Sequence, residues 1–228
     1  MVSVHFFGHS CFALETSRHK LVIDPWFTDN PLTDVKPEEV ECDYLLVTHG
    51  HFDHLGDAVA IAKRTGATII GVAELATYCA NQGAKAHGMH IGGSYRFPFG
   101  RLQLTPAWHG SSILGDNIYL GCPCGFIVEL EGKYIYHGGD TGLFGDMELI
   151  GQKYPIDVAL LPIGDNYVMG PEDAARAVKL IRPKTVVPMH YNTFDIIKQD
   201  PELFKQQVEA TTNSRCLILR PGETFHLE

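Results

Sequence analysis

The chain has 228 residues, of which 45% are hydrophobic and 20% are charged, and its formal net charge at pH 7 is −9. Length and composition predict one globular domain, residues 1–228, that is long enough to bury a substantial core. The acidic balance argues against broad electrostatic binding to nucleic acid or to an anionic membrane.

The first residues lack the basic stretch and apolar core of a signal peptide, and no apolar run approaches the roughly 20 residues that span a bilayer. The sequence therefore predicts a cytoplasmic protein without a membrane partner. In that compartment the six cysteines, including the close pair Cys122 and Cys124, are expected to be reduced thiols.

The N-terminal half of the chain predicts a meander of strands that leads into alternating strands and helices. Alternating apolar residues predict strands over 2–6, 11–15 and 21–23, and Pro25 prevents continuation of the third. A loop over 27–40, a buried strand over 43–47, a helix over 55–63, a strand over 67–72 and a helix over 73–82 follow. The alternation predicts a local βαβ arrangement.

The C-terminal half predicts a second group of strands with helices around it. We expect loops over 87–93 and 113–121, one strand over 95–108, and a hairpin over 125–136. A strand over 157–163, a helix over 171–181, a strand over 186–189, a helix from Asp200, and strands over 216–219 and 224–227 complete the chain. The whole pattern predicts an α/β protein with two sheets and helices outside them.

The segment Thr48–His54 has the sequence Thr-His-Gly-His-Phe-Asp-His and carries four side chains that can bind metal. It lies between a buried strand and a helix, at the edge of a sheet where ligand sites open. His49 and His51 are two residues apart, so both can reach one ion, whereas Asp53 and His54 follow the bend and suit a second. Imidazole and carboxylate without thiolate suit zinc, manganese, iron or nickel, and argue against a closed structural zinc site.

Three further residues share the position of this cluster at a strand end. His109 follows the strand over 95–108, Asp140 follows the hairpin after two glycines, and His190 follows the strand over 186–189. Together with the first four they make seven candidate ligands that could converge at one edge.

The order and separation of Thr48–His54, His109, Gly139-Asp140 and His190 resemble the metallo-β-lactamase-fold hydrolases over nearly the whole chain. Further segments resemble the UPF0173 metal-dependent hydrolases, a family related to ascorbate-6-phosphate lactonases. These segments are 8–12, 23–25, 136–144, 161–166, 169–175 and 190–194.

The resemblance implies a four-layer αββα sandwich with two divalent metal ions, for which zinc is our first expectation. A first ion would be held by His49, His51 and His109, a second by Asp53, His54 and His190, and Asp140 would bridge them. We expect a hydroxide between the ions to attack an ester, lactone or related bond of a small molecule. Asp53 would orient this hydroxide. The predicted catalytic residues are Asp53, Asp140 and His9.

Other polar residues near the predicted strand ends are candidates for supporting roles. Asp24 ends a buried strand and could accept the second N–H of a ligand imidazole. His9 follows a glycine at a strand break, where it could contact the substrate or donate a proton. Ser111, Asn166 and Tyr191 lie in predicted loops and are candidates for substrate contact.

The partner expected is a small-molecule substrate, and a homo-oligomer is compatible with the sequence. The main alternative is a phosphodiesterase or nuclease that uses the same two metals, although the acidic chain has no evident RNA-binding arm. A di-iron redox protein is a weaker alternative, because His51 occupies the position that such proteins fill with glutamate.

Overall fold

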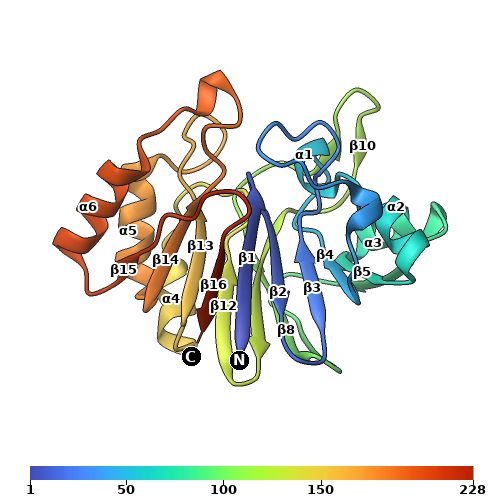
Figure 1. Ribbon diagram of the computed structural model, residues 1–228, viewed down its shortest axis with the longest axis horizontal. Helices are drawn as coiled ribbons and strands as arrows, with labels where there is room; N and C mark the ends of the chain where they lie inside the picture. The colour runs from blue at the N-terminus through green and yellow to red at the C-terminus, as the bar shows by residue number, and fades with distance from the viewer. Residues whose placement is uncertain (228) are drawn as a thin grey trace.

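A computed structural model describes residues 1–227 as two seven-stranded mixed sheets that pack face to face, with helices on both outer sides (Figure 1). The first sheet has the order β16-β1-β2-β3-β4-β5-β6 and the second the order β15-β14-β13-β12-β11-β8-β7. This arrangement confirms the predicted αββα sandwich. Among the described residues, no helix is long and apolar enough to cross a membrane.

The first sheet is built from the N-terminal half of the chain and its last strand. It consists of β1 (Val2–Gly8), β2 (Cys11–Glu15), β3 (Lys20–Ile23), β4 (Tyr44–Leu46), β5 (Thr68–Val72), β6 (Lys85–Met89) and β16 (Thr224–Leu227). The short helix α1 (Phe52–Leu55) follows β4, and α2 (Ala58–Thr65) and α3 (Ala73–Asn81) cover the outer face.

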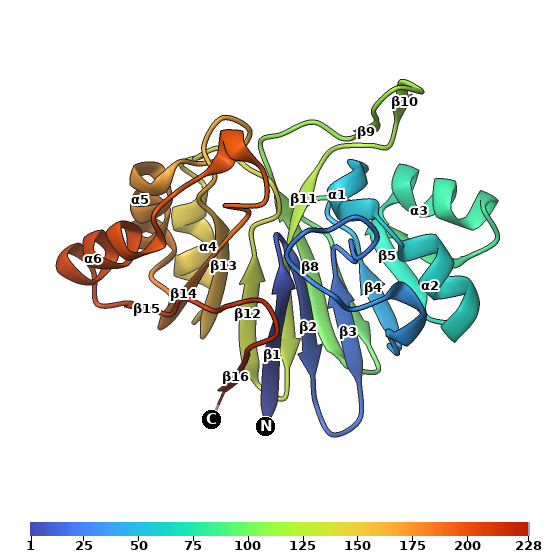
Figure 2. The ribbon, with the colours of Figure 1, turned by 45° about the horizontal axis from the view of Figure 1, so that its top comes forward.

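The second sheet carries the remaining long strands. It consists of β7 (Ser94–Phe97), β8 (Gly100–Pro106), β11 (Cys124–Leu130), β12 (Lys133–His137), β13 (Val158–Pro162), β14 (Thr185–Met189) and β15 (Arg215–Cys216). Helices α4 (Met147–Lys153), α5 (Pro171–Ile181) and α6 (Pro201–Thr211) lie on its outer side (Figure 1). The small hairpin β9 (Ser112–Ile113) and β10 (Ile118–Tyr119) projects from the body (Figure 2).

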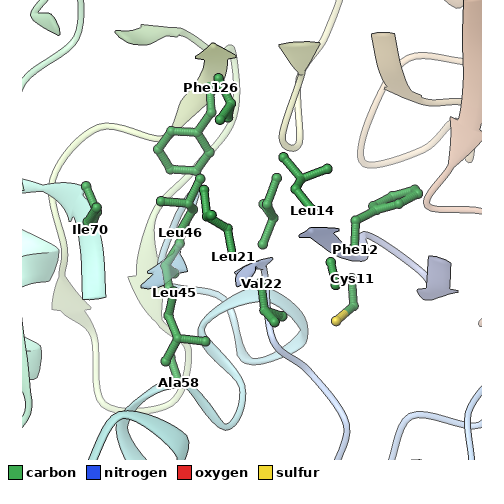
Figure 3. Close-up of a cluster of buried hydrophobic side chains, with 14 of the residues drawn as sticks. Cys11, Phe12, Leu14, Leu21, Val22, Leu45, Leu46, Ala58, Ile70 and Phe126 are labelled. Atoms are coloured by element: carbon green, nitrogen blue, oxygen red, sulfur yellow. The ribbon is translucent and has the colours of Figure 1, made fainter. Parts of the chain in front are cut away.

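Both faces of the central strands are buried, one against the other sheet and one under the helices. Successive side chains of a strand point to these opposite sides in turn. In β13, Val158 and Leu160 belong to the apolar cluster between the sheets, whereas Ala159 and Leu161 pack under the helices. In the first sheet, Leu46 points toward Phe126 of the second sheet, and Leu45 points toward Ala58 of α2 (Figure 3). Burial on both faces explains why these strands are nearly continuous runs of apolar residues.

The strand directions bring the functional segments to one edge. Strands β3 to β6 are mutually parallel, and β1 runs in the same direction because two antiparallel pairings separate it from β3. In the second sheet, β12, β13 and β14 are parallel, and β8 shares their direction by the same reasoning. The carboxyl ends of β1, β3, β4, β8, β12, β13 and β14 therefore precede the predicted site residues.

Several predicted element boundaries were wrong. The helix expected over 55–63 is divided into α1 and α2 at Gly56, which has φ +40° and whose Cβ would lie 2.7 Å from the carbonyl oxygen of Pro25. The strand expected over 95–108 is the hairpin β7–β8, which turns before Gly100 at φ +145°. A side chain at Gly100 would place its Cβ 1.9 Å from the carbonyl oxygen of Glu129, so tertiary packing requires glycine there.

Other elements were missed. Residues 85–89, partly expected as a loop, form the edge strand β6, which among the described strands pairs with β5 alone and keeps Lys85 exposed. The loop expected over 113–121 contains β9 and β10, and α4 had not been predicted. The strand expected over 216–219 is only the two-residue β15. These elements are short or lie at an edge, where the apolar pattern is weak.

Candidate metal centre

The seven candidate ligands come from five segments that follow strand ends. His49 and His51 lie in the loop after β4, Asp53 and His54 lie in α1, and His109, Asp140 and His190 follow β8, β12 and β14. His49, His54, Asp140 and His190 are almost fully buried, whereas the other three are partly exposed. Residues as much as 141 positions apart in the chain thus meet in one place.

The first donor set consists of three imidazoles. His51 Nδ1 lies 2.9 Å from His49 Nε2 and 3.2 Å from His109 Nε2. Nitrogens this close need a proton or a cation between them. A tetrahedral ion with nitrogen ligands at about 2.0–2.1 Å holds those nitrogens about 3.3–3.4 Å apart. The 3.2 Å separation of His109 from His51 is close to that geometry, and the 2.9 Å separation of His49 from His51 is shorter.

The second donor set surrounds the carboxylate of Asp140. Its Oδ1 lies 3.2 Å from His54 Nε2, and its Oδ2 lies 3.0 Å from His190 Nε2 and 3.5 Å from His109 Nε2. Asp53 Oδ2 lies 4.0 Å from His54 Nε2. The Asp140 carboxylate therefore faces ligand candidates of both sets at once.

Two of these donor atoms are buried without a hydrogen bond. His54 Nε2 and Asp140 Oδ1 have no partner of acceptable geometry among the described residues, although both are shielded from solvent. The two atoms lie 3.2 Å apart as an ion pair, and buried polar atoms without a well-formed hydrogen bond are costly unless an opposite charge or a bound ion compensates them. The donor atoms of His49, His54 and Asp140 all lie within 4.8 Å of one another. The residues present thus fit bound metal ions.

The buried carboxylate of Asp24 fixes the orientation of two imidazoles. It accepts hydrogen bonds from Thr48 N at 2.8 Å, from Thr48 Oγ1 at 2.8 Å and from His54 Nδ1 at 2.7 Å. Because the Thr48 hydroxyl donates to Asp24, it must accept the hydrogen of His49 Nδ1, which lies 3.0 Å away. Both imidazoles therefore direct Nε2 toward the site.

Charge at the centre depends on His54. Burial alone would lower the pKa of His54, but Asp140, Asp24 and Asp53 raise it well above its ordinary value. Burial alone would raise the pKa of Asp140, but His190 and His54 hold it well below its ordinary value. At neutral pH the metal-free site thus holds a protonated imidazole among ionised carboxylates, and a metal ion would take the place of that positive charge.

His9 lies beside the second donor set. Its Nε2 is 3.1 Å from Asp53 Oδ2, and its Nδ1 is 2.8 Å from Thr193 Oγ1. Because an ionised carboxylate can only accept, Nε2 carries the hydrogen and the Thr193 hydroxyl donates to Nδ1. Burial, followed by nearby His190, lowers the pKa of His9 to about 4. His9 is therefore a neutral donor that fixes the position of Asp53.

The backbone is left-handed at three of these residues. His9, Asp24 and His190 have φ of +57°, +48° and +55°, a region that costs about 1–2 kcal/mol for residues other than glycine. Hydrogen bonds hold them there, since His190 N donates to the carbonyl oxygen of His9 at 2.8 Å and Asp24 N to that of Leu46 at 2.9 Å. Unusual backbone at strand ends thus coincides with the site.

A cavity of about 450 Å³ opens above the centre. Its polar lining consists of His51, Asp53, His109, Asp140 and His190, and its apolar lining of Phe52, Leu114, Tyr167, Phe194 and Ile196. The size lies within the range of small-molecule sites, about 300–1,000 Å³. The cavity gives a small molecule access to both donor sets.

The residues expected to contact substrate do not line this cavity. The hydroxyl of Ser111 is buried below the loop after β4 and accepts from Gly50 N at 3.2 Å. Tyr191 packs against the apolar cluster under α5 and α6. Asn166 is not among the lining residues, whereas its neighbour Tyr167 is. The five apolar lining residues were not predicted, because isolated apolar residues in loops give no periodic signal.

Comparison with known proteins agrees with this geometry. Residues 3–190 match the family described as the beta-lactamase superfamily domain. The chain is 58% identical to a UPF0173 metal-dependent hydrolase of Pelotomaculum thermopropionicum, over 99% of this chain and 100% of that protein. It is 55% identical to another from Heliobacterium modesticaldum, over 100% and 98%.

A solved structure extends the similarity to three dimensions. It belongs to a metallo hydrolase of the archaeon Ignicoccus hospitalis, with a TM-score of 0.90 and 42% identity, and covers 100% of this chain and 99% of that one. The predicted fold and the predicted membership of the UPF0173 hydrolases are confirmed. The relation to ascorbate-6-phosphate lactonases stays a prediction.

Proposed function

The chain belongs to the UPF0173 metal-dependent hydrolases of the beta-lactamase superfamily, and we propose that it hydrolyses an ester, lactone or related bond of a small molecule at a two-metal site. One observation carries this proposal. The Asp140 carboxylate faces His54 with one oxygen and His190 and His109 with the other, between two sets of donors. A carboxylate in that position can be shared by two ions.

In this proposal, His49, His51 and His109 hold one ion, and Asp53, His54 and His190 hold the other. Donor sets of imidazole and carboxylate suit zinc first, and manganese, nickel or iron as alternatives. When bound, a pair of divalent ions lowers the pKa of water toward neutrality and polarises the oxygen of the bond that is cleaved.

The protein residues supply position. Asp53 is partly exposed to the cavity, and its carboxylate is held from behind by His9 Nε2. Asp53 can therefore orient an attacking water. Burial alone would raise the pKa of Asp53, but His54 and His9 hold it well below its ordinary value and keep the carboxylate ionised. His9 acts through Asp53 as a positioning residue, and Asp24 holds His54 and, through Thr48, His49.

The test combines metal analysis with a panel of substrates. Purified protein loaded with zinc or manganese should contain about two ions per chain and should hydrolyse esters, lactones or thioesters. Phosphodiesters and β-lactams form the other members of the panel. Turnover of phosphodiesters alone would contradict the proposal and favour a phosphodiesterase, and a chain with both ions but no turnover would indicate binding without catalysis.

A further inference from the structure

The cavity above the metal centre has a wall of exposed apolar side chains. Four large apolar residues that line it, Phe52, Leu114, Tyr167 and Ile196, are between 54% and 66% exposed. They account for four of the eleven most exposed large apolar side chains among residues 1–227. Exposed apolar surface concentrated around a concave site marks a surface that binds apolar groups.

One part of this wall is held rigidly. Phe194 stacks on Trp26 with ring centroids 6.0 Å apart, and Phe52 meets the same indole edge-on at 5.7 Å. Trp26 is 4% exposed and anchors both rings in the body of the protein. This part of the wall is therefore formed before a ligand arrives, which lowers the entropic cost of binding.

The wall carries no positive charge. No lysine or arginine is among the residues that line the cavity in the described part of the chain. Lys198, the basic residue closest in sequence to Ile196, pairs with Asp195 at 2.6 Å. An anionic group on the part of a substrate that lies against the wall would lose water and meet no lysine or arginine among the lining residues, which is unfavourable.

We propose that this site selects neutral substrates whose acyl part is an aliphatic or aromatic group, and that it rejects substrates with a second, remote anionic group such as a carboxylate or phosphate. This inference rests on the hydrolysis proposed above. Water adds its oxygen to the acyl carbon, the bond from that carbon to the leaving oxygen breaks, and the leaving oxygen takes a proton. The products are a carboxylic acid and an alcohol.

A matched pair of esters tests the selectivity. Methyl hexanoate and monomethyl adipate have the same ester group and the same chain, but the first ends in a methyl group and the second in a carboxylate. With metal-loaded protein, kcat/KM from methanol release should favour methyl hexanoate at least about tenfold. Equal rates, or a preference for the adipate, would overturn the inference while leaving the proposed hydrolysis intact.

Binding of the corresponding amides separates the two proposals. Hexanamide and adipamic acid differ in the same way as the esters, and their binding can be measured by calorimetry without turnover. Tighter binding of hexanamide supports the selectivity even if neither ester is hydrolysed. The absence of ester turnover would count against the proposed hydrolysis and not against the selectivity. Tighter or equal binding of adipamic acid overturns the selectivity.

A substitution in the wall links the selectivity to this surface. Ile196→Lys places a cation at an exposed position of the wall, so the ratio of kcat/KM for the adipate to that for the hexanoate should rise about fivefold. Leu149→Lys is the control, because Leu149 is also 58% exposed but lies in α4 and not in the cavity lining. An unchanged ratio in Ile196→Lys, or the same rise in Leu149→Lys, would overturn the inference.

Discussion

Replacing Asp24 by asparagine should weaken metal binding through the tautomer of His54. The Asp24 carboxylate is fully buried and accepts three hydrogen bonds, two from Thr48 and one from His54 Nδ1 at 2.7 Å. An asparagine keeps one acceptor oxygen, but its amide nitrogen must face one of these donors. If the amide nitrogen faces His54, it donates to Nδ1 and favours the tautomer of His54 that carries its hydrogen on Nε2. That tautomer has no lone pair on Nε2 for a metal.

The size of the effect follows from the contacts that are lost. Removing a carboxylate that supports a ligand imidazole costs about 10–100-fold in metal affinity, or about 1.4–2.7 kcal/mol. The lost charge-assisted hydrogen bond should also lower the free energy of unfolding of the metal-free protein by about 1.5–3 kcal/mol. Fold and metal site should thus weaken together in Asp24→Asn.

The matched control is Asp57→Asn. Asp57 also accepts three hydrogen bonds, from Phe27 N, Thr28 N and Thr28 Oγ1, and none of these donors belongs to a histidine. Metal affinity is measured by titrating zinc into metal-free protein against a chromophoric chelator, and stability by denaturant unfolding with chelator present. Wild-type affinity in Asp24→Asn, or an equal loss of affinity in Asp57→Asn, would refute the reasoning.

Three further predictions concern the same centre. Asp140→Ala should lower the bound metal, measured by elemental analysis, for both ions together, and two retained ions would contradict a bridging role. His9→Ala should lower kcat about tenfold through the loss of its bond to Asp53, with metal content unchanged; a large loss of metal would make His9 a ligand instead. Because the raised pKa of His54 leaves it protonated at pH 7, zinc binding at that pH should release a proton, measured by calorimetry in buffers of different ionisation enthalpy. This release, and the stability that charged His54 gives the metal-free protein, should both disappear as pH rises through the raised pKa.

The sequence predicted where the ligand candidates lie because two regularities combine. Parallel strands present their carboxyl ends at one edge of a sheet, and metal-competent residues at those ends are conspicuous. His109, Asp140 and His190 could therefore be grouped with His49, and the structure brings their side chains within a few ångströms. Local residue type and strand direction were sufficient for that step.

Features that depend on tertiary contacts could not be predicted. Gly56 looked like one residue of a continuous helix, but its φ is +40° and the backbone of Pro25 and Trp26 leaves no room for a side chain there. The hydrogen bond from His9 to Asp53 joins residues 44 positions apart, and nothing in either segment specifies it. The left-handed backbone at His9 likewise becomes visible only in three dimensions.

Three residues of the cavity wall lie outside the segments that carry the metal ligands, and this separation has a consequence for specificity. The ligands follow strands whose positions are fixed by the core between the sheets, whereas Leu114 and Tyr167 project from loops and Ile196 from the short 3-10 helix η2 (Asp195–Ile197). Loops can change with little cost to the core, so the same metal centre can serve different substrates on one scaffold. Substitutions in the wall should therefore alter the ratio of substrates hydrolysed and leave metal content unchanged. Membership of the family accordingly defines the class of reaction, and the substrate of this chain has to be inferred from the wall.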